Sequence, residues 1–261
     1  MLFVQRVGSG VIAAVADAGR GGMLLARMAA ALPSIHRSFR EILRQMFIVG
    51  NGSLPLVMIT SVFTGAVAAV QSAYQMGAYV PVNLLGTVVA KMVFIELGPV
   101  LTALVVGARV SSSIAAELGT MRVTEQIDAL EMLAIDPVRY LALPRFVACV
   151  LMLPVLTIFA DLVAVLGAFI VSTFTLDITS KVFTSGLRFL FYAHDIWGGL
   201  IKAAVFGGII AVSGVISGFN TQGGAQGVGS AAMHAVVSSA LMVLVADYLL
   251  ATIIFQVFFG S

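Results

Sequence analysis

Five long apolar runs constrain the fold of this chain more than any other feature. A helix needs roughly 20 mainly apolar residues to cross about 30 Å of hydrocarbon. Hydrophobic residues make up 60% of the 261 positions and charged residues only 10%, against roughly a quarter charged in ordinary soluble domains. We therefore expect an all-α integral membrane protein with five transmembrane helices, at about residues 54–74, 84–110, 146–174, 198–219 and 235–259.

Residues 1–52 differ from the rest of the chain. The stretch from Leu2 to Leu32 is apolar but is interrupted by charged residues and by clustered glycines. We expect it, together with residues 34–49, to form N-terminal amphipathic helices that lie in the membrane interface, ahead of a membrane domain spanning residues 53–261. A signal peptide is the competing interpretation. It is disfavoured because a basic start, an apolar middle and a small-residue cleavage site are not found in order.

The distribution of basic residues predicts the orientation. Six arginines lie in residues 1–52 and four more lie between residues 109 and 145, two regions that share one side if there are five spans. The opposite side has only Lys181 and Arg188 outside the spans. Because cytoplasmic loops carry an excess of Lys and Arg, we expect a cytoplasmic N-terminus and a periplasmic C-terminus. The formal net charge of +2 gives no reason to expect a nucleic-acid partner.

A polar segment from Glu117 to Pro137 separates the second and third expected spans. Val123, Ile127 and Leu130 recur at helical spacing and would form one apolar face. Such a helix could rest on the membrane surface, but an acidic helix is poorly suited to an anionic cytoplasmic leaflet. A protein partner is therefore the better interpretation. The candidate docking residues are its charged side chains: Glu117, Arg122, Glu125, Asp128, Glu131 and Asp136.

The chain shows no motif for nucleotide or metal chemistry. It contains no G-x-x-x-x-G-K-[ST], the loop with which a P-loop ATPase cradles phosphates, so the chain cannot build that phosphate site by itself and we expect no cofactor in it. The three histidines, His36, His194 and His234, are dispersed over different segments, and a shared metal site is not expected. Cys149 is the only cysteine, so no intramolecular disulfide can form.

The block from Glu96 to Phe146 makes the sequence recognisable. It reads ELGPVLTALVVGARVSSSIAAELGTMRVTEQIDALEMLAIDPVRYLALPRF and closely resembles the MlaE (YrbE) family, the permease subunits of ABC transporters that move phospholipid between membranes. A weaker similarity extends from about Ser34 to the C-terminus, with IKAAVF around Lys202 and VADYLLA around Asp247. In some members of the family an arginine precedes the glutamate at position 96, where this chain has Ile95, so the charge arrangement of those members is not expected to carry over unchanged.

The resemblance implies a transporter subunit that is not itself an enzyme. It implies a multi-pass protein of the inner membrane, with residues 53–261 as the permease domain and the Glu117 to Pro137 segment as the coupling helix that an ATPase grips. The work implied is phospholipid movement between inner and outer membranes, which maintains outer-membrane lipid asymmetry. The implied partners are a second copy of the chain, a MlaF-like ABC ATPase that binds ATP and its Mg²⁺, a MlaB-like STAS-domain protein and a periplasmic MlaD-like ring of MCE domains.

Five ionisable residues lie within the expected spans: Lys91, Glu96, Asp161, Lys202 and Asp247. Each costs roughly 2.5 to 3.5 kcal/mol to insert and usually faces a partner, a cavity or a substrate path, so pairing is expected. They could simply hold helices together, with the lysines snorkelling outward. The functional interpretation is a polar element in a lipid path, loosened at Gly98 and Pro99. The lipid-path candidates are Glu96, Lys91, Lys202 and Asp247, with Gln71 and Tyr74 on the apolar first span.

One alternative function remains open. Glu96, Asp161 and Asp247 could relay protons in a proton-coupled secondary lipid transporter. Transporters of that class are commonly built from inverted repeats, and five spans without a visible repeat disfavour this interpretation.

Overall fold

The computed structural model describes residues 19, 21–24, 26–28, 30, 31, 38–76, 81–188 and 193–259. Within these ranges every regular element is a helix, as expected for an all-α membrane protein. Most of the predicted N-terminal interfacial region lies outside the described residues. The described positions between 19 and 31 are helical, and whether they lie in the interface stays a prediction.

Eleven elements follow one another in the described part of the chain. They are α2 (Phe39–Met76), η2 (Val82–Leu84), α3 (Leu85–Met92), η3 (Val93–Leu97), α4 (Gly98–Val123), α5 (Gln126–Met132), η4 (Val138–Ala142), α6 (Leu143–Phe174), α7 (Ser180–Arg188), α8 (Ala193–Phe219) and α9 (Gly224–Phe259). Here η2 is a 3₁₀-helix, whereas η3 and η4 are single π-helical turns.

Five stretches are long and apolar enough to cross a membrane. They are Phe39–Met76, Leu85–Val123, Val138–Phe174, His194–Phe219 and Gly224–Gln256, which confirms the expected number of spans. The helices are longer than the apolar runs that predict them. In particular, α2 is continuous across residues 52 and 53, where the sequence suggests a domain boundary, and α4 continues past residue 110 to Val123.

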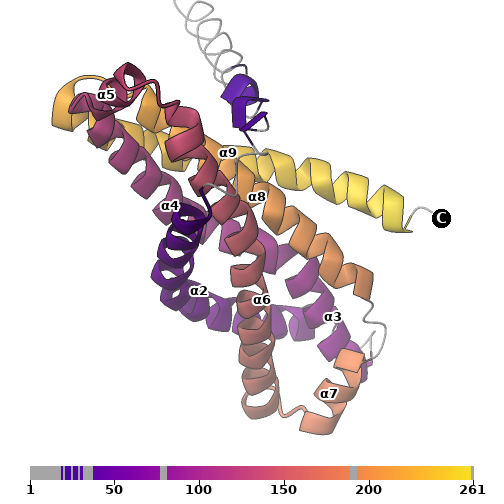
Figure 1. The fold of residues 1–261 in the computed structure, drawn as a ribbon. Helices are drawn as coiled ribbons and strands as arrows, with labels where there is room; N and C mark the ends of the chain where they lie inside the picture. Colours follow the sequence, from indigo (N-terminus) through magenta and orange to yellow (C-terminus); the bar gives the residue numbers. More distant parts are fainter. Residues whose placement is uncertain are drawn as a thin grey trace, which may run out of the picture.

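The short helices lie at opposite ends of the molecule (Figure 1). The α5 helix is at one end, and α3 and α7 are at the other. At the α3 end, the Thr87 hydroxyl donates a hydrogen bond to the Gly186 carbonyl. At the α5 end, Gly119 lies against Thr221 in the turn before α9. Alternate loops therefore lie at alternate ends, which is the arrangement that five successive spans require.

Small residues let the spans approach closely. The structure leaves no room for a side chain at Gly65, which faces the backbone of Ala164, or at Gly167, which faces the backbone of Val62. In the first contact the glycine belongs to α2, and in the second it belongs to α6, so each helix packs a glycine against the backbone of the other. Small residues that permit backbone contact are typical of helix packing in membranes, where apolar surface alone gives little driving force.

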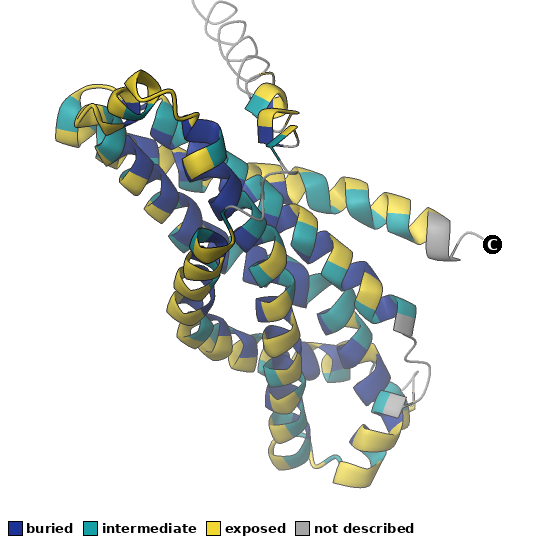
Figure 2. Cartoon of the chain, in the orientation of Figure 1, coloured by how far each residue is buried: buried dark blue, intermediate teal, exposed yellow. Residues whose placement is uncertain are grey.

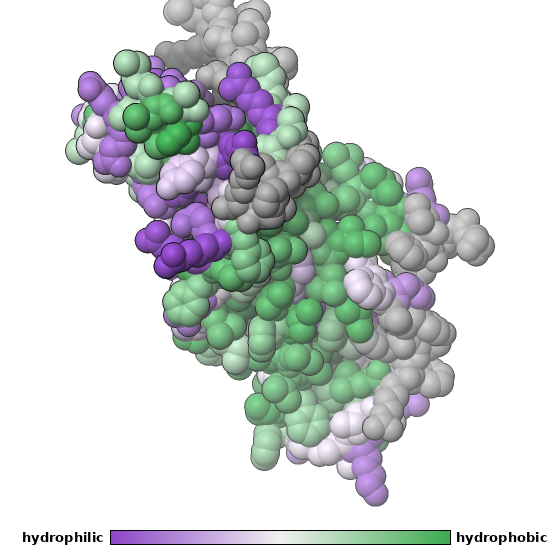
Figure 3. Space-filling view, viewed as in Figure 1, coloured by the Kyte–Doolittle hydropathy of each residue, from purple (hydrophilic) through white to green (hydrophobic). Residues whose placement is uncertain are grey.

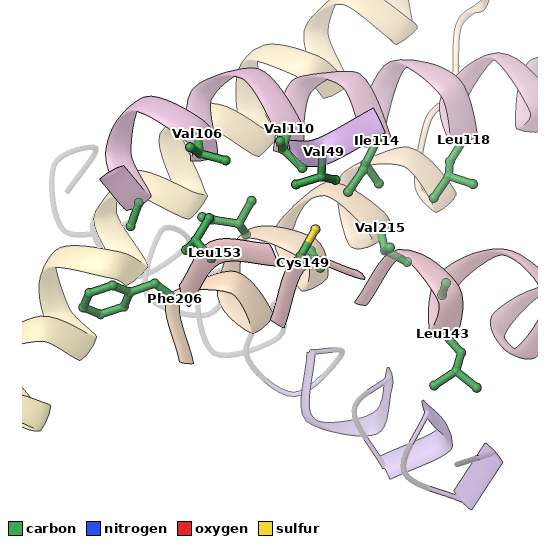
Figure 4. Close-up of a cluster of buried hydrophobic side chains, with 14 of the residues drawn as sticks. Val49, Val106, Val110, Ile114, Leu118, Leu143, Cys149, Leu153, Phe206 and Val215 are labelled. Carbon is green, nitrogen blue, oxygen red and sulfur yellow. The ribbon is translucent and has the colours of Figure 1, made fainter. Parts of the chain in front are cut away.

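The outward surface is largely apolar. Exposed residues run along the outer faces of α2 and α6 (Figure 2), and hydrophobic side chains gather over the middle of the molecule between more hydrophilic ends (Figure 3). The interior contains a cluster contributed by α2, α4, α6 and α8, including Val49, Val106, Cys149 and Phe206 (Figure 4). A hydrophobic belt around a packed helical interior is what a multi-pass membrane protein presents to lipid.

Candidate functional site

Lys202 of α8 lies between two carboxylates from other spans. Its Nζ donates a hydrogen bond to Glu96 Oε2 at 2.6 Å and another to Asp247 Oδ1 at 3.0 Å. The Lys202 side chain is only 1% exposed. The structure thus brings three of the predicted lipid-path residues together from η3, α8 and α9, and we call them the polar triad.

The three residues lie at a common depth. Glu96 is eleven residues after Leu85, Lys202 is eight after His194, and Asp247 is nine before Gln256. At 1.5 Å per residue these separations correspond to about 12 to 17 Å from the ends of their spans. All three ends are at the α3 end of the molecule if the spans alternate in direction. The polar triad is therefore inside the span region, nearer the α3 end.

A π-helical turn presents Glu96. In η3 the Gly98 N–H donates to the Val93 carbonyl instead of following the α-helical pattern, and Pro99 has no N–H to donate. Single π-turns inside long helices occur frequently at functional sites. The sequence predicted loosening at Gly98 and Pro99, whereas the irregular turn lies just before them.

Close packing of α8 on this turn positions Lys202. A side chain at Gly199 would collide with the Phe94 carbonyl of η3 and would lie 3.1 Å from the Pro99 ring. Only glycine fits there, and Lys202 follows one helical turn later. The short distance between Lys202 and Glu96 therefore depends on a backbone contact as well as on charge.

Glu96 is the most exposed member of the polar triad. Its side chain is 42% exposed, compared with 16% for Asp247. A carboxylate exposed within a span is costly against hydrocarbon and normally faces a cavity, water or a partner. The triad has two carboxylates and one ammonium, so it carries a formal excess of one negative charge. Its exposed face requires something other than acyl chains beside it.

The remaining lipid-path candidates lie elsewhere. Lys91 pairs with Asp195 of α8 at 3.6 Å and does not join the polar triad. Gln71 and Tyr74 are exposed near the end of α2, and no hydrogen bond or ion pair between described residues links them to the triad. Their part in a lipid path stays a prediction.

Asp161 is buried without a counter-ion among the described residues. It is 3% exposed, and its Oδ1 atom has no hydrogen-bond partner there. The carboxylate is in close contact with Gly98, where any side chain would collide with it. Asp161 is thus near the π-turn in space but is not hydrogen-bonded to Glu96 or Asp247.

The predicted coupling segment is divided between two helices. Glu117 and Arg122 belong to the last turns of α4, a turn follows at Thr124 and Glu125, and Asp128 and Glu131 lie on α5. Glu125 has φ +60°, the left-handed conformation that a sharp change of direction requires. Asp136 follows α5 and accepts a hydrogen bond from the Val138 N–H at 3.0 Å.

Part of the predicted apolar face is used for internal packing. Ile127 is buried, Leu130 packs against the main core cluster, and Val123 is exposed. The apolar side chains left at the tip are Met132, which is 88% exposed, and Leu133, which is 71% exposed. The tip of the segment therefore combines exposed acidic groups with two exposed apolar side chains.

One ion pair lies within the segment, and a second joins it to α6. Arg122 pairs with Asp128 across the turn, and Glu117 pairs with Arg145 of α6 at 2.9 Å. Arg145 is buried and also donates to the Leu141 carbonyl at 2.7 Å, within the π-turn η4 that precedes Pro144. In the sequence, Arg145 is noticeable only as one of the basic residues that predict the orientation. The one sign of a structural role is its position directly after Pro144, at the start of an apolar run.

Comparison with known protein families shows where this chain belongs. The family model described as Permease MlaE matches residues 42–253. The chain belongs to the MlaE family. This confirms the resemblance seen in the block from Glu96 to Phe146 and extends it across all five spans.

Relatives of this MlaE-family chain are found in bacteria and in a chloroplast. The intermembrane phospholipid transport system permease protein MlaE of Haemophilus influenzae is 32% identical over 254 residues, 97% of each chain. A probable ABC transporter permease protein of Rickettsia prowazekii is 43% identical over 217 residues, 83% of each chain. The chloroplastic protein TRIGALACTOSYLDIACYLGLYCEROL 1 of Arabidopsis thaliana is 36% identical over 218 residues, 84% of this chain and 62% of the relative.

Proposed function

We propose that this chain is the inner-membrane permease subunit of an ABC transporter for phospholipids, driven by ATP hydrolysis in a separate subunit. The observation that supports it most is the polar triad, whose exposed Glu96 side requires a polar neighbour within the membrane. A phospholipid headgroup is such a neighbour, with its acyl chains against the apolar surfaces of the spans. The almost full-length similarity to an intermembrane phospholipid transport permease supports the same cargo.

The working unit we propose is a homodimer. The α9 span buries only 11% of its apolar window within the single chain, and exposed apolar side chains such as Leu241, Leu249 and Ile253 lie along it. A second copy would cover part of this surface and would enclose the exposed side of Glu96. The dimer cavity would then hold the lipid at the level of the polar triad.

In this proposal, the coupling segment is the part of the chain on which the ATPase acts. A MlaF-like ABC ATPase would contact the acidic groups and the exposed Met132 and Leu133 at the tip of α5. A MlaB-like STAS-domain protein would accompany the ATPase, and a periplasmic MlaD-like ring of MCE domains would receive or deliver lipid at the α3 end. Maintenance of outer-membrane lipid asymmetry is the physiological task that this arrangement would serve.

The test combines ATPase binding with lipid transfer. The double substitution Met132→Ser with Leu133→Ser should reduce co-purification of the ATPase by at least about tenfold, since two exposed apolar anchors are removed. The single substitution Glu96→Gln should leave co-purification intact but reduce ATP-dependent phospholipid transfer in reconstituted vesicles. Lys181→Gln, on exposed α7 at the other end, is the matched control for ATPase co-purification.

Two results would count against the proposal. One is full ATPase binding by the Met132 and Leu133 variant. The other is phospholipid transfer that continues after ATP is depleted and stops when the proton gradient is collapsed, which would favour the proton-coupled alternative. That alternative stays a prediction. Its proposed relay lacks a hydrogen bond between Asp161 and either other carboxylate among the described residues.

A further inference from the structure

An open groove of about 990 Å³ lies between the beginning of α2 and the chain that follows α5. It is separate from the polar triad and beside the exposed tip of the coupling segment. Its charged and aromatic lining comes from both walls: Arg40, Glu41 and Arg44 from α2, and Asp136, Arg139 and Tyr140 from the other side. Three guanidinium groups and two carboxylates therefore share one concave surface.

The two carboxylates are already engaged. Glu41 accepts a hydrogen bond from Gln45 Nε2 at 3.0 Å and lies 3.7 Å from the Arg44 guanidinium. Asp136 accepts the hydrogen bond from the Val138 N–H. Within the described part of the chain no carboxylate forms an ion pair with Arg40 or Arg139.

Arg40 and Arg139 thus line the groove from different elements, α2 and η4, and neither has a carboxylate partner among the described residues. The planar guanidinium group presents a fork of donors that suits a phosphate and holds it through paired hydrogen bonds. Arg40 and Arg139 both line the groove, and they offer the kind of donors that a phosphate anion accepts.

The surface beside the arginines is apolar. Phe39, Leu43 and Phe47 are spaced four residues apart on α2, so they share one face of the helix, and all three are exposed. Figure 3 shows hydrophilic residues at the beginning of α2 directly beside the hydrophobic surface. An adjacent apolar surface adds nothing to the binding of a soluble anion. It does add to the binding of a phospholipid, which has a phosphate at one end and acyl chains at the other.

We propose that this groove binds the headgroup phosphate of an anionic phospholipid from the surrounding leaflet, with its acyl chains along Phe39, Leu43 and Phe47. The site is near the α5 end of the molecule, which the arginine distribution places in the cytoplasmic leaflet, where anionic lipids are attracted by basic residues. A bound lipid would join the start of α2 to the end of the coupling segment and to η4. The proposal does not depend on transport, because it concerns a lipid of the leaflet and not the cargo at the polar triad.

The test is photo-labelling of the full-length protein in nanodiscs. One arm contains a photo-activatable phosphatidylglycerol and a second contains the matching phosphatidylcholine probe, and labelled peptides are mapped by mass spectrometry. The phosphatidylglycerol label should map to residues 38–47 and 134–140. The double substitution Arg40→Gln with Arg139→Gln should reduce that label by about tenfold, since each basic residue near an anionic membrane contributes severalfold to lipid attraction.

Matched variants separate a specific site from general charge. Lys181→Gln removes one exposed cation at the other end and should leave the label unchanged. Arg40→Lys with Arg139→Lys keeps the charge but loses the paired hydrogen bonds, and it should retain only part of the label. Circular dichroism and gel filtration of each variant confirm that the helical fold is intact.

Four outcomes would overturn the proposal. Labelling at the groove that is unchanged in the Arg40 and Arg139 double variant would show that these groups do not bind the lipid. Equal labelling by phosphatidylcholine would exclude selection for anionic lipid. Displacement by excess inorganic phosphate would indicate a soluble anion site. Cross-linking of residues 38–44 to an ATPase, without lipid label in the free chain, would assign the groove to a protein partner.

Discussion

Lys202 is the residue on which the polar triad depends, because it is the only cation within ion-pair distance of Glu96 and Asp247 among the described residues. Breaking a buried ion pair by removing one partner commonly costs about 3 to 5 kcal/mol, since the remaining charge is left without compensation. In this triad the loss would leave two carboxylates facing each other within the span region. The attraction through Lys202 of α8 would be lost, and Glu96 of the π-turn and Asp247 of α9 would repel each other.

We therefore predict that Lys202→Met lowers the free energy of unfolding by about 3 kcal/mol. Thermal unfolding of the purified protein in detergent measures the effect. Lys181→Met is the control, because Lys181 is exposed on α7 and substitutions at exposed positions usually change stability by less than about 0.5 kcal/mol. Equal destabilisation by the two substitutions would contradict the conclusion that the polar triad depends on Lys202 for stability.

A combined variant separates stability from function. The triple substitution Glu96→Gln, Lys202→Met and Asp247→Asn removes all three charges, and replacement of a whole buried ion network is often nearly neutral for stability. We expect most of the stability lost in Lys202→Met to return while phospholipid transfer stays low. Full recovery of transfer would show that the polar triad only holds the helices together.

At the level of single elements, the end of α5 contains a strained backbone. The Ile135 N–H donates to the Leu130 carbonyl and the Ala134 N–H donates to the Glu131 carbonyl, both at 2.9 Å. These paired bonds close the helix in a Schellman motif. Ala134 occupies the left-handed position with φ +58°, where glycine is preferred because a Cβ atom costs roughly 1 kcal/mol.

Ala134→Gly should therefore protect the end of α5. We predict slower hydrogen exchange at the amides of Ala134 and Ile135, by about two- to fivefold, because relief of the left-handed strain amounts to a fraction of the roughly 1 kcal/mol penalty. Ala129→Gly, in the middle of the same helix, should have the opposite effect, since glycine destabilises helix interiors. Faster exchange in the Ala134 variant would contradict the motif.

The spans were predictable from sequence, whereas their ends were not. Hydropathy finds a span because the bilayer imposes a minimum apolar length, and all five were found. Helix ends lie outside this constraint. The α4 helix continues to Val123 because its last turns are held by packing and by the pair between Glu117 and Arg145, contacts that join residues far apart in the chain.

The same reasoning explains what was found at the candidate site. The cost of charge in a membrane identified Lys91, Glu96, Lys202 and Asp247 as residues that need partners. It could not say which lysine joins Glu96. That choice depends on the contact between Gly199 and the π-turn, a tertiary feature that leaves no periodic signal in the sequence.

At the scale of the whole molecule, the second span links the two candidate sites. Leu85–Val123 is helical throughout its 39 residues and contains Glu96 near one end and Arg122 near the other. Twenty-six residues separate these two positions, or about 39 Å along a helix at 1.5 Å per residue. A push on the coupling segment would therefore reach the polar triad through one continuous element. This linkage requires the two ends of the molecule to lie on opposite sides of the membrane.

Thiol labelling tests that orientation with few changes to the chain. Cys149 is the only cysteine and is buried, so the unmodified protein should react weakly with a membrane-impermeant maleimide. Met132→Cys and Asn220→Cys place single reporters at exposed positions of the α5 end, and Lys181→Cys places one on α7. We predict that intact cells label only the Lys181 variant and that inverted membrane vesicles label only the other two.

The expected pattern follows from the arginine distribution, which predicts that the α5 end is cytoplasmic. Asn220→Cys is included because it lies in the turn between α8 and α9, so the α5 end is reported from two different elements. Each reporter is made again with Cys149→Ala to exclude reaction at the native thiol. Labelling of Lys181→Cys and Asn220→Cys from the same side would contradict the five-span arrangement, and with it the path from ATPase to polar triad along the second span.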